Sequence, residues 1–158
     1  MNDSQPRLLG TGFYFDELKV GDRFRSSGRT ITEADLVAFV NRTWLTEELF
    51  TSKVPVVAHE LKGRVVPGAL VYSFAEGLMK SFMEGTGVAF LGTEIAVKAP
   101  TRVDDTIHVE MEIIEARVTS KGDRGVVKAV SRVINQNREE VLVYTPVRLM
   151  KRRSSGAS

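Results

Sequence analysis

The sequence contains no cysteine, which excludes disulfide bonds, thiolate metal ligands and a cysteine nucleophile. The only histidines are His59 and His108, and neither belongs to an HExxH motif or another metal-ligand spacing. The longest apolar runs fall far short of the ~20 residues that span a bilayer, and the start, MNDSQPRLLG, has no basic segment followed by an apolar run. We therefore expect a cytoplasmic protein without a metal, a secretory signal or a membrane span.

The charge pattern gives no sign of nucleic-acid binding. The formal net charge is +2 in 158 residues, and the basic excess lies near the C-terminus in Lys151, Arg152 and Arg153. No basic stripe with interleaved aromatic residues is present. This length suits one domain with one core, which we place at residues 1–153, with residues 154–158 as a disordered tail.

Two helices are expected in the first half of the chain. Thr32 lies three residues before Asp35, which is the spacing of a capping box at the start of a helix. Leu36, Phe39 and Val40 then recur at helical spacing. Residues 45–62 are expected to form a loop with one short helix. A second helix over 67–83 is apolar almost all round, which is typical of a helix buried on most sides. Pro67 suits its first turn because the missing N–H costs nothing there.

From residue 88 onward the apolar period changes from helical spacing to two. Residues 88–98 are expected to form one strand, ended by Pro100. The residues around His108 alternate between apolar and polar, so His108 should point outward into solvent. Two more strands are expected over 125–135 and 140–150. An antiparallel sheet wrapped around a buried helix covers both apolar faces, so the fold class is α+β.

Several segments, taken in order, resemble the MaoC-like hydratase/dehydratase family of hotdog proteins. They are residues 15–22, the helix start at 30–36 followed by Phe39 and Thr43, the sequence Gly63-Arg64-Val65-Val66-Pro67-Gly68, and the later Ala99-Pro100 and Asp104-Asp105-Thr106. The resemblance covers nearly the whole chain. It implies a hotdog fold, a homodimer with sheets joined edge to edge, and (R)-specific hydration of 2-enoyl thioesters, with coenzyme A present only as part of the substrate.

In that family an aspartate and a histidine activate water, and a backbone amide at the start of the central helix polarises the thioester carbonyl. Aligned without a gap, the aspartate falls on Leu45 and the histidine on Phe50, and neither side chain can transfer a proton. Gly68 is retained as the amide donor. The resemblance further implies substrate contacts from Leu45, Phe50, Arg64, Val66, Pro67 and Ala69.

Other residues in the same region could replace the missing pair. Glu47 and Glu48 lie in the right loop and could act as a base if desolvated, although solvated carboxylates are the commoner case. His59 could turn toward the pocket or be a surface histidine. Arg64 could meet a phosphate of coenzyme A or pair with a carboxylate.

Three functions remain open at this point. The first is an acyl-thioester enzyme of hydratase type with replaced acid–base groups. The second is a silent binder or regulatory subunit for acyl-coenzyme A or an acyl carrier protein. The third is thioester hydrolysis, which needs a carboxylate on the central helix, where Glu76 lies inside and Glu84 at the end.

Overall fold

Strand β5 shows most simply how the sequence forms the sheet. In the computed structural model, which describes residues 9–54 and 64–153, β5 spans Thr106–Val118. The alternating apolar residues Ile107, Val109, Met111 and Ile113 are each at most 4% exposed. They point toward the helix because alternate side chains share one face of a strand.

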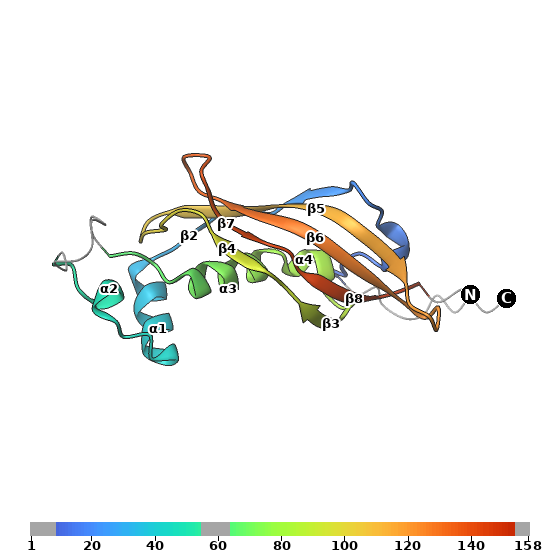
Figure 1. Cartoon of the computed structure of the whole chain (residues 1–158), viewed down its shortest axis with the longest axis horizontal. Helices are drawn as coiled ribbons and strands as arrows, with labels where there is room; N and C mark the ends of the chain where they lie inside the picture. The colour runs from blue at the N-terminus through green and yellow to red at the C-terminus, as the bar shows by residue number, and fades with distance from the viewer. Residues whose placement is uncertain (1–8, 55–63, 154–158) are drawn as a thin grey trace.

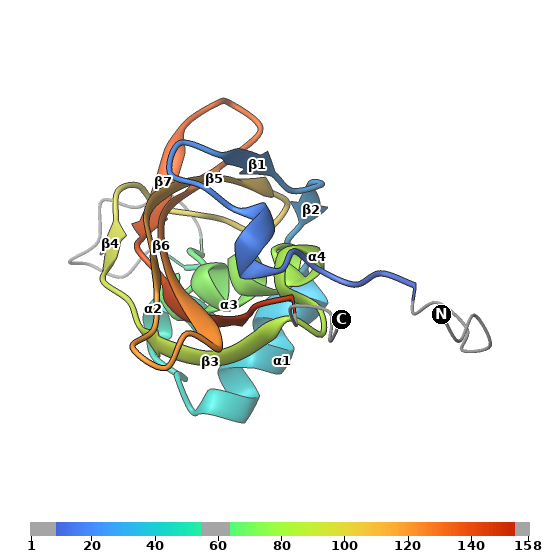
Figure 2. The ribbon, with the colours of Figure 1, turned by 90° about the vertical axis from the view of Figure 1, so that its right-hand side faces the viewer.

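The sheet is antiparallel, with the order β1-β5-β6-β7-β4; β2 also pairs with β5, and β8 pairs with both β3 and β6. The strands are β1 (Arg23–Arg25), β2 (Arg29–Thr30), β3 (Gly87–Gly92), β4 (Ile95–Val97), β5, β6 (Arg124–Ile134), β7 (Glu140–Tyr144) and β8 (Val147–Lys151). Figure 2 shows this sheet curving around α3, the central helix. The expected α+β hotdog arrangement is therefore confirmed.

The helices within the described residues are a single 3-10 turn and four α-helical segments: η1 (Phe15–Glu17), α1 (Glu33–Thr43), α2 (Glu48–Thr51), α3 (Gly68–Leu78) and α4 (Lys80–Met83). The predicted capping box of α1 is present, since the Thr32 side chain accepts from the Asp35 N–H and the Asp35 carboxylate accepts from the Thr32 N–H. The short helix expected after residue 45 is α2. In Figure 1, α1 and α2 lie beyond one end of the sheet.

The central helix is shorter than expected. It starts at Gly68 with Pro67 as its N-cap, and it is interrupted at Met79, whose backbone angles are φ −89° and ψ 6°. Gly77 lies in the last turn of α3, where its low helix propensity weakens the helix. The prediction of one continuous helix over 67–83 is therefore wrong.

Two long strands expected from the sequence are also divided. The expected strand 88–98 is β3 and β4, separated at Thr93 and Glu94, and the expected strand 140–150 is β7 and β8, separated at Thr145 and Pro146. The two breaks face each other, since the Thr145 N–H donates to the Glu94 carbonyl at 3.0 Å. Pro146 has no N–H for the ladder, which favours a break at this level.

The main core lies between α3, α4 and the concave face of the sheet. It includes Leu70, Val71, Ala75 and Phe82 from the helices, with Val133, Leu142, Tyr144 and Met150 from the strands. Leu36 and Val40 of α1 are also buried, at 1% and 3% exposure, but they lie outside this cluster. Helix α1 therefore buries Leu36 and Val40 apart from the main core, while its Phe39 packs against that core.

Candidate functional site

A cavity of about 300 Å³ lies at the start of α3. Gly68 and Val71 contribute from the helix, and Val97 and Leu142 contribute from β4 and β7. The remaining lining residues are Val65, Val66, Lys98, Ala99, Pro100, Thr101 and Val141. The walls are thus mostly aliphatic, and they meet at the positive end of a helix.

The first turn of α3 presents backbone donors at this cavity. The Leu70 and Val71 N–H groups are bonded to the Pro67 carbonyl at 3.0 and 3.2 Å. Gly68 and Ala69, as the first residues of the helix, have no intrahelical acceptor for their N–H groups. Pro67 offers no side-chain cap. An oxygen ligand in the cavity can therefore accept from an amide that also carries the partial positive charge of the helix.

The segment before α3 is held firmly in place. The Val66 N–H donates to the Thr101 carbonyl at 2.7 Å, and Val65 forms an isolated bridge with Arg102. Val66 and Pro67 are buried, whereas Ala69 is exposed. Of the three, only Val66 lines the cavity as described.

Arg64 pairs with Glu33 of α1, and its side chain is only 11% exposed. The guanidinium lowers the pKa of the Glu33 carboxyl by hydrogen bonding. Of the two roles considered for Arg64, the structure shows the carboxylate pair. This pair joins the first turn of α1 to the entry of α3.

The residues that the ungapped alignment predicts at the dyad positions, Leu45 and Phe50, lie on the segment after α1. Trp44 ends α1 in a left-handed conformation at φ 61°, and Leu45 follows it. Leu45 and Phe50 are both half-buried, and neither is among the described lining residues. The two residues that the ungapped alignment predicts at the dyad positions are therefore apolar and lie outside the described lining of the cavity.

The predicted substitute bases are not gathered at the cavity. Glu47 and Glu48 are exposed at the start of α2, and neither lines the cavity as described. His59 lies outside the described residues, as do residues 154–158. His108 does point away from the core, but the prediction that it is solvated is wrong: its side chain is only 16% exposed and lies 3.4 Å from Glu110.

A second polar group lies farther along α3, and only its Glu76 was suggested by the sequence. Glu76 pairs with Arg148 of β8 at 2.5 Å, and the Arg148 side chain is only 8% exposed. Tyr72 of α3 contacts the ring of Tyr144 of β7, with centroids 5.2 Å apart. One signal was available in the sequence: Arg148 shares a strand face with the buried Met150, so an inward arginine could have been expected.

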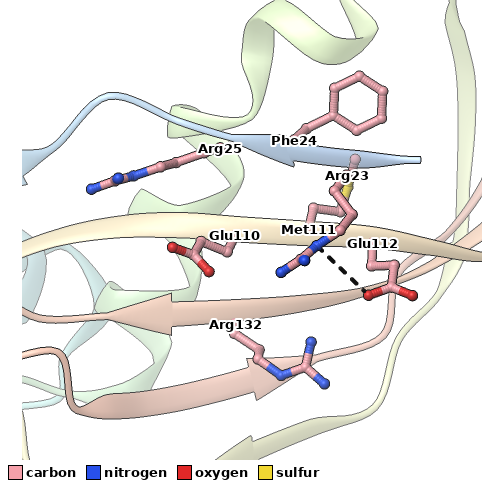
Figure 3. A pocket seen from close by; sticks show the side chains of 7 residues that line it. All are labelled: Arg23, Phe24, Arg25, Glu110, Met111, Glu112 and Arg132. Atoms are coloured by element: carbon pink, nitrogen blue, oxygen red, sulfur yellow. Dashed lines mark ion pairs between the residues drawn. The ribbon is translucent and has the colours of Figure 1, made fainter. Parts of the chain in front are cut away.

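A larger hollow, about 590 Å³, lies on the other face of the sheet over β1, β5 and β6. Figure 3 shows its lining, in which arginines and glutamates alternate across the strands: Arg23, Phe24, Arg25, Glu110, Met111, Glu112 and Arg132. Arg23 lies 3.9 Å from Glu112, and Arg132 lies 3.3 Å from Glu140. These charges largely offset one another, so the hollow is a weaker ligand site than the cavity at Gly68.

Residues 9–54 and 64–153 contain neither a candidate metal site nor a candidate membrane-spanning helix. In those ranges, no group of three or more histidine, aspartate and glutamate side chains could hold a metal ion. No helix there is long and apolar enough to cross a bilayer.

Comparison with known proteins gives one curated relative and many structural neighbours, while no family model matches the chain. An (R)-specific enoyl-CoA hydratase from Rhodospirillum rubrum is 26% identical over 100 residues, covering 63% of this chain and 69% of that protein. The crystal structure of a MaoC-like dehydratase from Rhodospirillum rubrum matches with a TM-score of 0.81 at 25% identity, covering 90% of this chain and 99% of that one.

A third likeness concerns the fold alone. A Mycobacterium tuberculosis protein with a double hotdog fold matches with a TM-score of 0.75 at 19% identity, covering 96% of this chain and 48% of that one. The present chain thus corresponds in length to about half of that protein. A hydratase relative in sequence and a dehydratase neighbour in structure, each matched over most of both chains, agree on one likeness: the chain has a hotdog fold and is similar to the MaoC-like hydratases and dehydratases.

Proposed function

We propose that the protein binds short acyl thioesters of coenzyme A or an acyl carrier protein at the start of α3, and that its hydratase activity is lost or strongly reduced. The observation that carries the proposal is the cavity beside Gly68. An acyl chain fits its aliphatic walls, and the thioester oxygen can accept from the Gly68 amide at the positive end of the helix. Its volume of about 300 Å³ is at the lower end for ligand pockets, which favours short chains.

The loss of hydration follows from the side chains after α1. Adding water to an enoyl thioester needs one group that takes a proton from water and one that returns a proton to carbon. Leu45 and Phe50 can do neither. Glu47 and Glu48 are exposed, and neither lines the cavity as described. A protein that keeps the binding site and lacks the groups for proton transfer is better described as a catalytically inactive acyl-thioester binder than as an active hydratase.

Thioester hydrolysis by Glu76 receives less support. This carboxylate is already engaged by Arg148 at 2.5 Å, and it lies two turns beyond Gly68 on α3. A nucleophile or base for hydrolysis must instead reach the carbonyl carbon held at the helix start.

The same proposal includes a homodimer formed along β3 and β4. This edge exposes large apolar side chains: Phe90 at 46%, Leu91 at 54%, Ile95 at 48% and Val97 at 62%. Neither strand has a described pairing partner on its outer side, and such an edge favours pairing with another strand. A second copy of the chain, related by twofold symmetry, can pair with the free backbone groups of this edge. Two hotdog units do occur together in the Mycobacterium tuberculosis neighbour.

Calorimetry with butyryl-coenzyme A, a saturated ligand that cannot be hydrated, tests the binding function. We expect it to bind more tightly than coenzyme A alone, because only the acyl form fills the cavity. A spectrophotometric assay with crotonyl-coenzyme A should show turnover far below about 10 per second, a typical enzyme rate. Equal affinity for coenzyme A and its butyryl thioester would refute acyl binding, and robust crotonyl turnover would refute the loss of hydration.

Light scattering after gel filtration tests the dimer. Leu91→Lys places a charge on the proposed interface and should yield monomers. Val118→Lys is the matched control, because Val118 is 45% exposed at the far end of β5. A wild-type protein that is monomeric at high concentration, or an unaffected Leu91→Lys variant, contradicts the proposed edge.

A further inference from the structure

Thr101 brings a buried polar side chain to the cavity at the start of α3. It belongs to the lining of that cavity and is only 4% exposed. Its carbonyl accepts the Val66 N–H at 2.7 Å, and the N–H of the neighbouring Arg102 donates to the Asp105 carboxylate at 2.8 Å. Backbone hydrogen bonds therefore hold Thr101 close to the residues that lead into the first turn of α3.

The hydroxyl group of Thr101 has no hydrogen-bond partner within the described residues. The Thr86 hydroxyl also lacks a partner there, but it is completely sealed from solvent. Thr101 differs, because its hydroxyl oxygen keeps some accessible surface and the residue lines a cavity. A buried hydroxyl without a partner is unfavourable unless water or a ligand binds it. The cavity is therefore the place from which a partner for the Thr101 hydroxyl can come.

The rest of the lining offers few other polar groups. Apart from Thr101, only Lys98 among the described lining residues has a polar side chain, and Lys98 is exposed, so its ammonium group can stay in water. The Gly68 amide is the free backbone donor at the helix start. A volume of about 300 Å³ corresponds to a sphere about 8 Å across, so one small acyl group can reach both Gly68 and Thr101.

We propose that Thr101 is a specificity-determining residue of the cavity: its hydroxyl binds a hydroxyl group on the acyl chain while the Gly68 amide holds the thioester oxygen. The protein then prefers short hydroxyacyl thioesters to analogues that carry a methyl group in place of the hydroxyl. This role of Thr101 rests on the proposed binding of acyl thioesters at Gly68, and it adds the class of acyl group that the site selects.

A neutral hydroxyl group on the ligand matches Thr101 better than a charged group. A threonine hydroxyl can both donate and accept a hydrogen bond, so it can pair with a ligand hydroxyl in either direction. A carboxylate among aliphatic walls would lose its hydration, and one hydroxyl could not compensate for that loss.

The size of the cavity fits a hydroxyl group close to the thioester. With bonds of about 1.5 Å, an extended chain places a hydroxyl oxygen on C3 or C4 about 4–5 Å from the carbonyl carbon. A further hydrogen bond of about 2.8 Å gives a reach of about 7–8 Å. This reach matches the width of the cavity, so a chain held at Gly68 can present its hydroxyl to Thr101.

Two pairs of coenzyme A thioesters, each pair differing by a hydroxyl in place of a methyl group, test this role by calorimetry on the full chain. The pairs are 3-hydroxybutyryl (each enantiomer) with 3-methylbutyryl, and 4-hydroxybutyryl with pentanoyl, and they distinguish a hydroxyl on C3 from one on C4. We expect the hydroxylated member of at least one pair to bind about fivefold more tightly. In Thr101→Val, which keeps the shape of the side chain, this ratio should fall to about one, whereas Thr101→Ser should retain most of it.

Thr86→Val is the matched control. It makes the same replacement at a buried hydroxyl without a partner, but Thr86 is not among the described lining residues, so the ratio should stay at its wild-type value. Both valine variants should fold, because each removes a hydroxyl that makes no hydrogen bond within the described residues. Should Thr101→Val nevertheless fail to fold, Thr101→Ala must abolish the ratio instead.

The outcomes separate the role of Thr101 from the binding function on which it rests. Equal or weaker binding of the hydroxylated member in both pairs overturns the role while leaving acyl binding intact, and would mean that water occupies the Thr101 hydroxyl. An unchanged ratio in Thr101→Val also overturns it, because the ligand hydroxyl is then recognised elsewhere. An equal loss of affinity for both members of a pair overturns it as well, because Thr101 then holds the pantetheine arm. Failure of all these thioesters to bind removes the proposed function itself.

Discussion

Gly68→Ala adds one methyl group at the point where the proposed carbonyl-binding amide opens into the cavity. The new Cβ would lie 3.0 Å from Val97 Cγ2, whereas an unstrained carbon–carbon contact is about 3.5–4.0 Å. Val97 must therefore withdraw by about 0.5–1 Å. It can do so, because its side chain is 62% exposed on a short edge strand.

The substitution should leave folding intact and weaken binding. Gly68 has no positive φ, so alanine fits the backbone and should stabilise the protein by about 0.4–1 kcal/mol by restricting the unfolded chain. The methyl group crowds the amide and prevents a close approach of the thioester oxygen. Losing that hydrogen bond costs about 1–1.5 kcal/mol, which is about a 5- to 10-fold rise in Kd.

Gly77→Ala is the matched control within the same helix. Gly77 is exposed, and a Cβ there meets no atom within 4 Å. Both variants should melt at or slightly above the wild-type temperature, but only Gly68→Ala should bind butyryl-coenzyme A more weakly in calorimetry. A folded Gly68→Ala protein with wild-type affinity would refute the assignment of the Gly68 amide to the thioester oxygen.

Three other predictions concern the lost dyad, the buried ion pair and the cap of α1. Leu45→Asp combined with Phe50→His should hydrate crotonyl-coenzyme A faster than either single variant; no gain in a folded double variant means that this segment follows a different path from that of the hydratases. Arg148→Ala should lower the free energy of unfolding in urea by about 2–3 kcal/mol, because it leaves the Glu76 carboxylate unpaired in a largely covered site, and a loss under about 0.5 kcal/mol, typical of a surface substitution, would contradict this. The hydrogen bond from the Thr32 amide lowers the pKa of Asp35 from its usual 3.8. The ionised carboxylate therefore contributes fully to the free energy of unfolding above that pH, and this contribution disappears as the pH falls through the lower pKa of the folded state. Asp35→Asn should reduce the drop in melting temperature on acidification, and an identical drop in the variant would argue against the cap.

The features predicted well from the sequence are those set by neighbouring residues. The capping box needs only Thr32 and Asp35, and the alternation of β5 needs only its own residues, so both could be predicted locally. The division of the expected strand 88–98 could not, because residues 93 and 94 bend opposite the break at Pro146, which lies far away in the chain. The apolar pattern predicts on which face of the sheet each side chain lies, but it does not predict the residues at which two paired strands break.

The candidate site shows the same limit. Gly68 could be identified from its place after Pro67 and from the family resemblance. The pairing of Glu76 with Arg148 joins residues that are 72 positions apart, and only the fold decides which helix turn meets which strand. Arg64 had two reasonable partners in the sequence, and the position of α1 brought Glu33 to it. The sequence alone therefore does not predict which distant residue each charged side chain pairs with.

The position of α1 and α2 beyond one end of the sheet also bears on how such a protein can change over time. The segment with Leu45 and Phe50 lies beyond the end of the sheet (Figure 1), whereas Gly68 is built into the start of the central helix. Substitutions in the segment with Leu45 and Phe50 alter reactivity with little effect on folding, because the buried helix and sheet do not depend on those side chains. Substitutions at the start of the central helix affect folding and ligand binding together. Under the proposed function, catalytic activity can thus be lost or regained through substitutions near α1 and α2, while the proposed thioester-binding site at the start of α3 is retained.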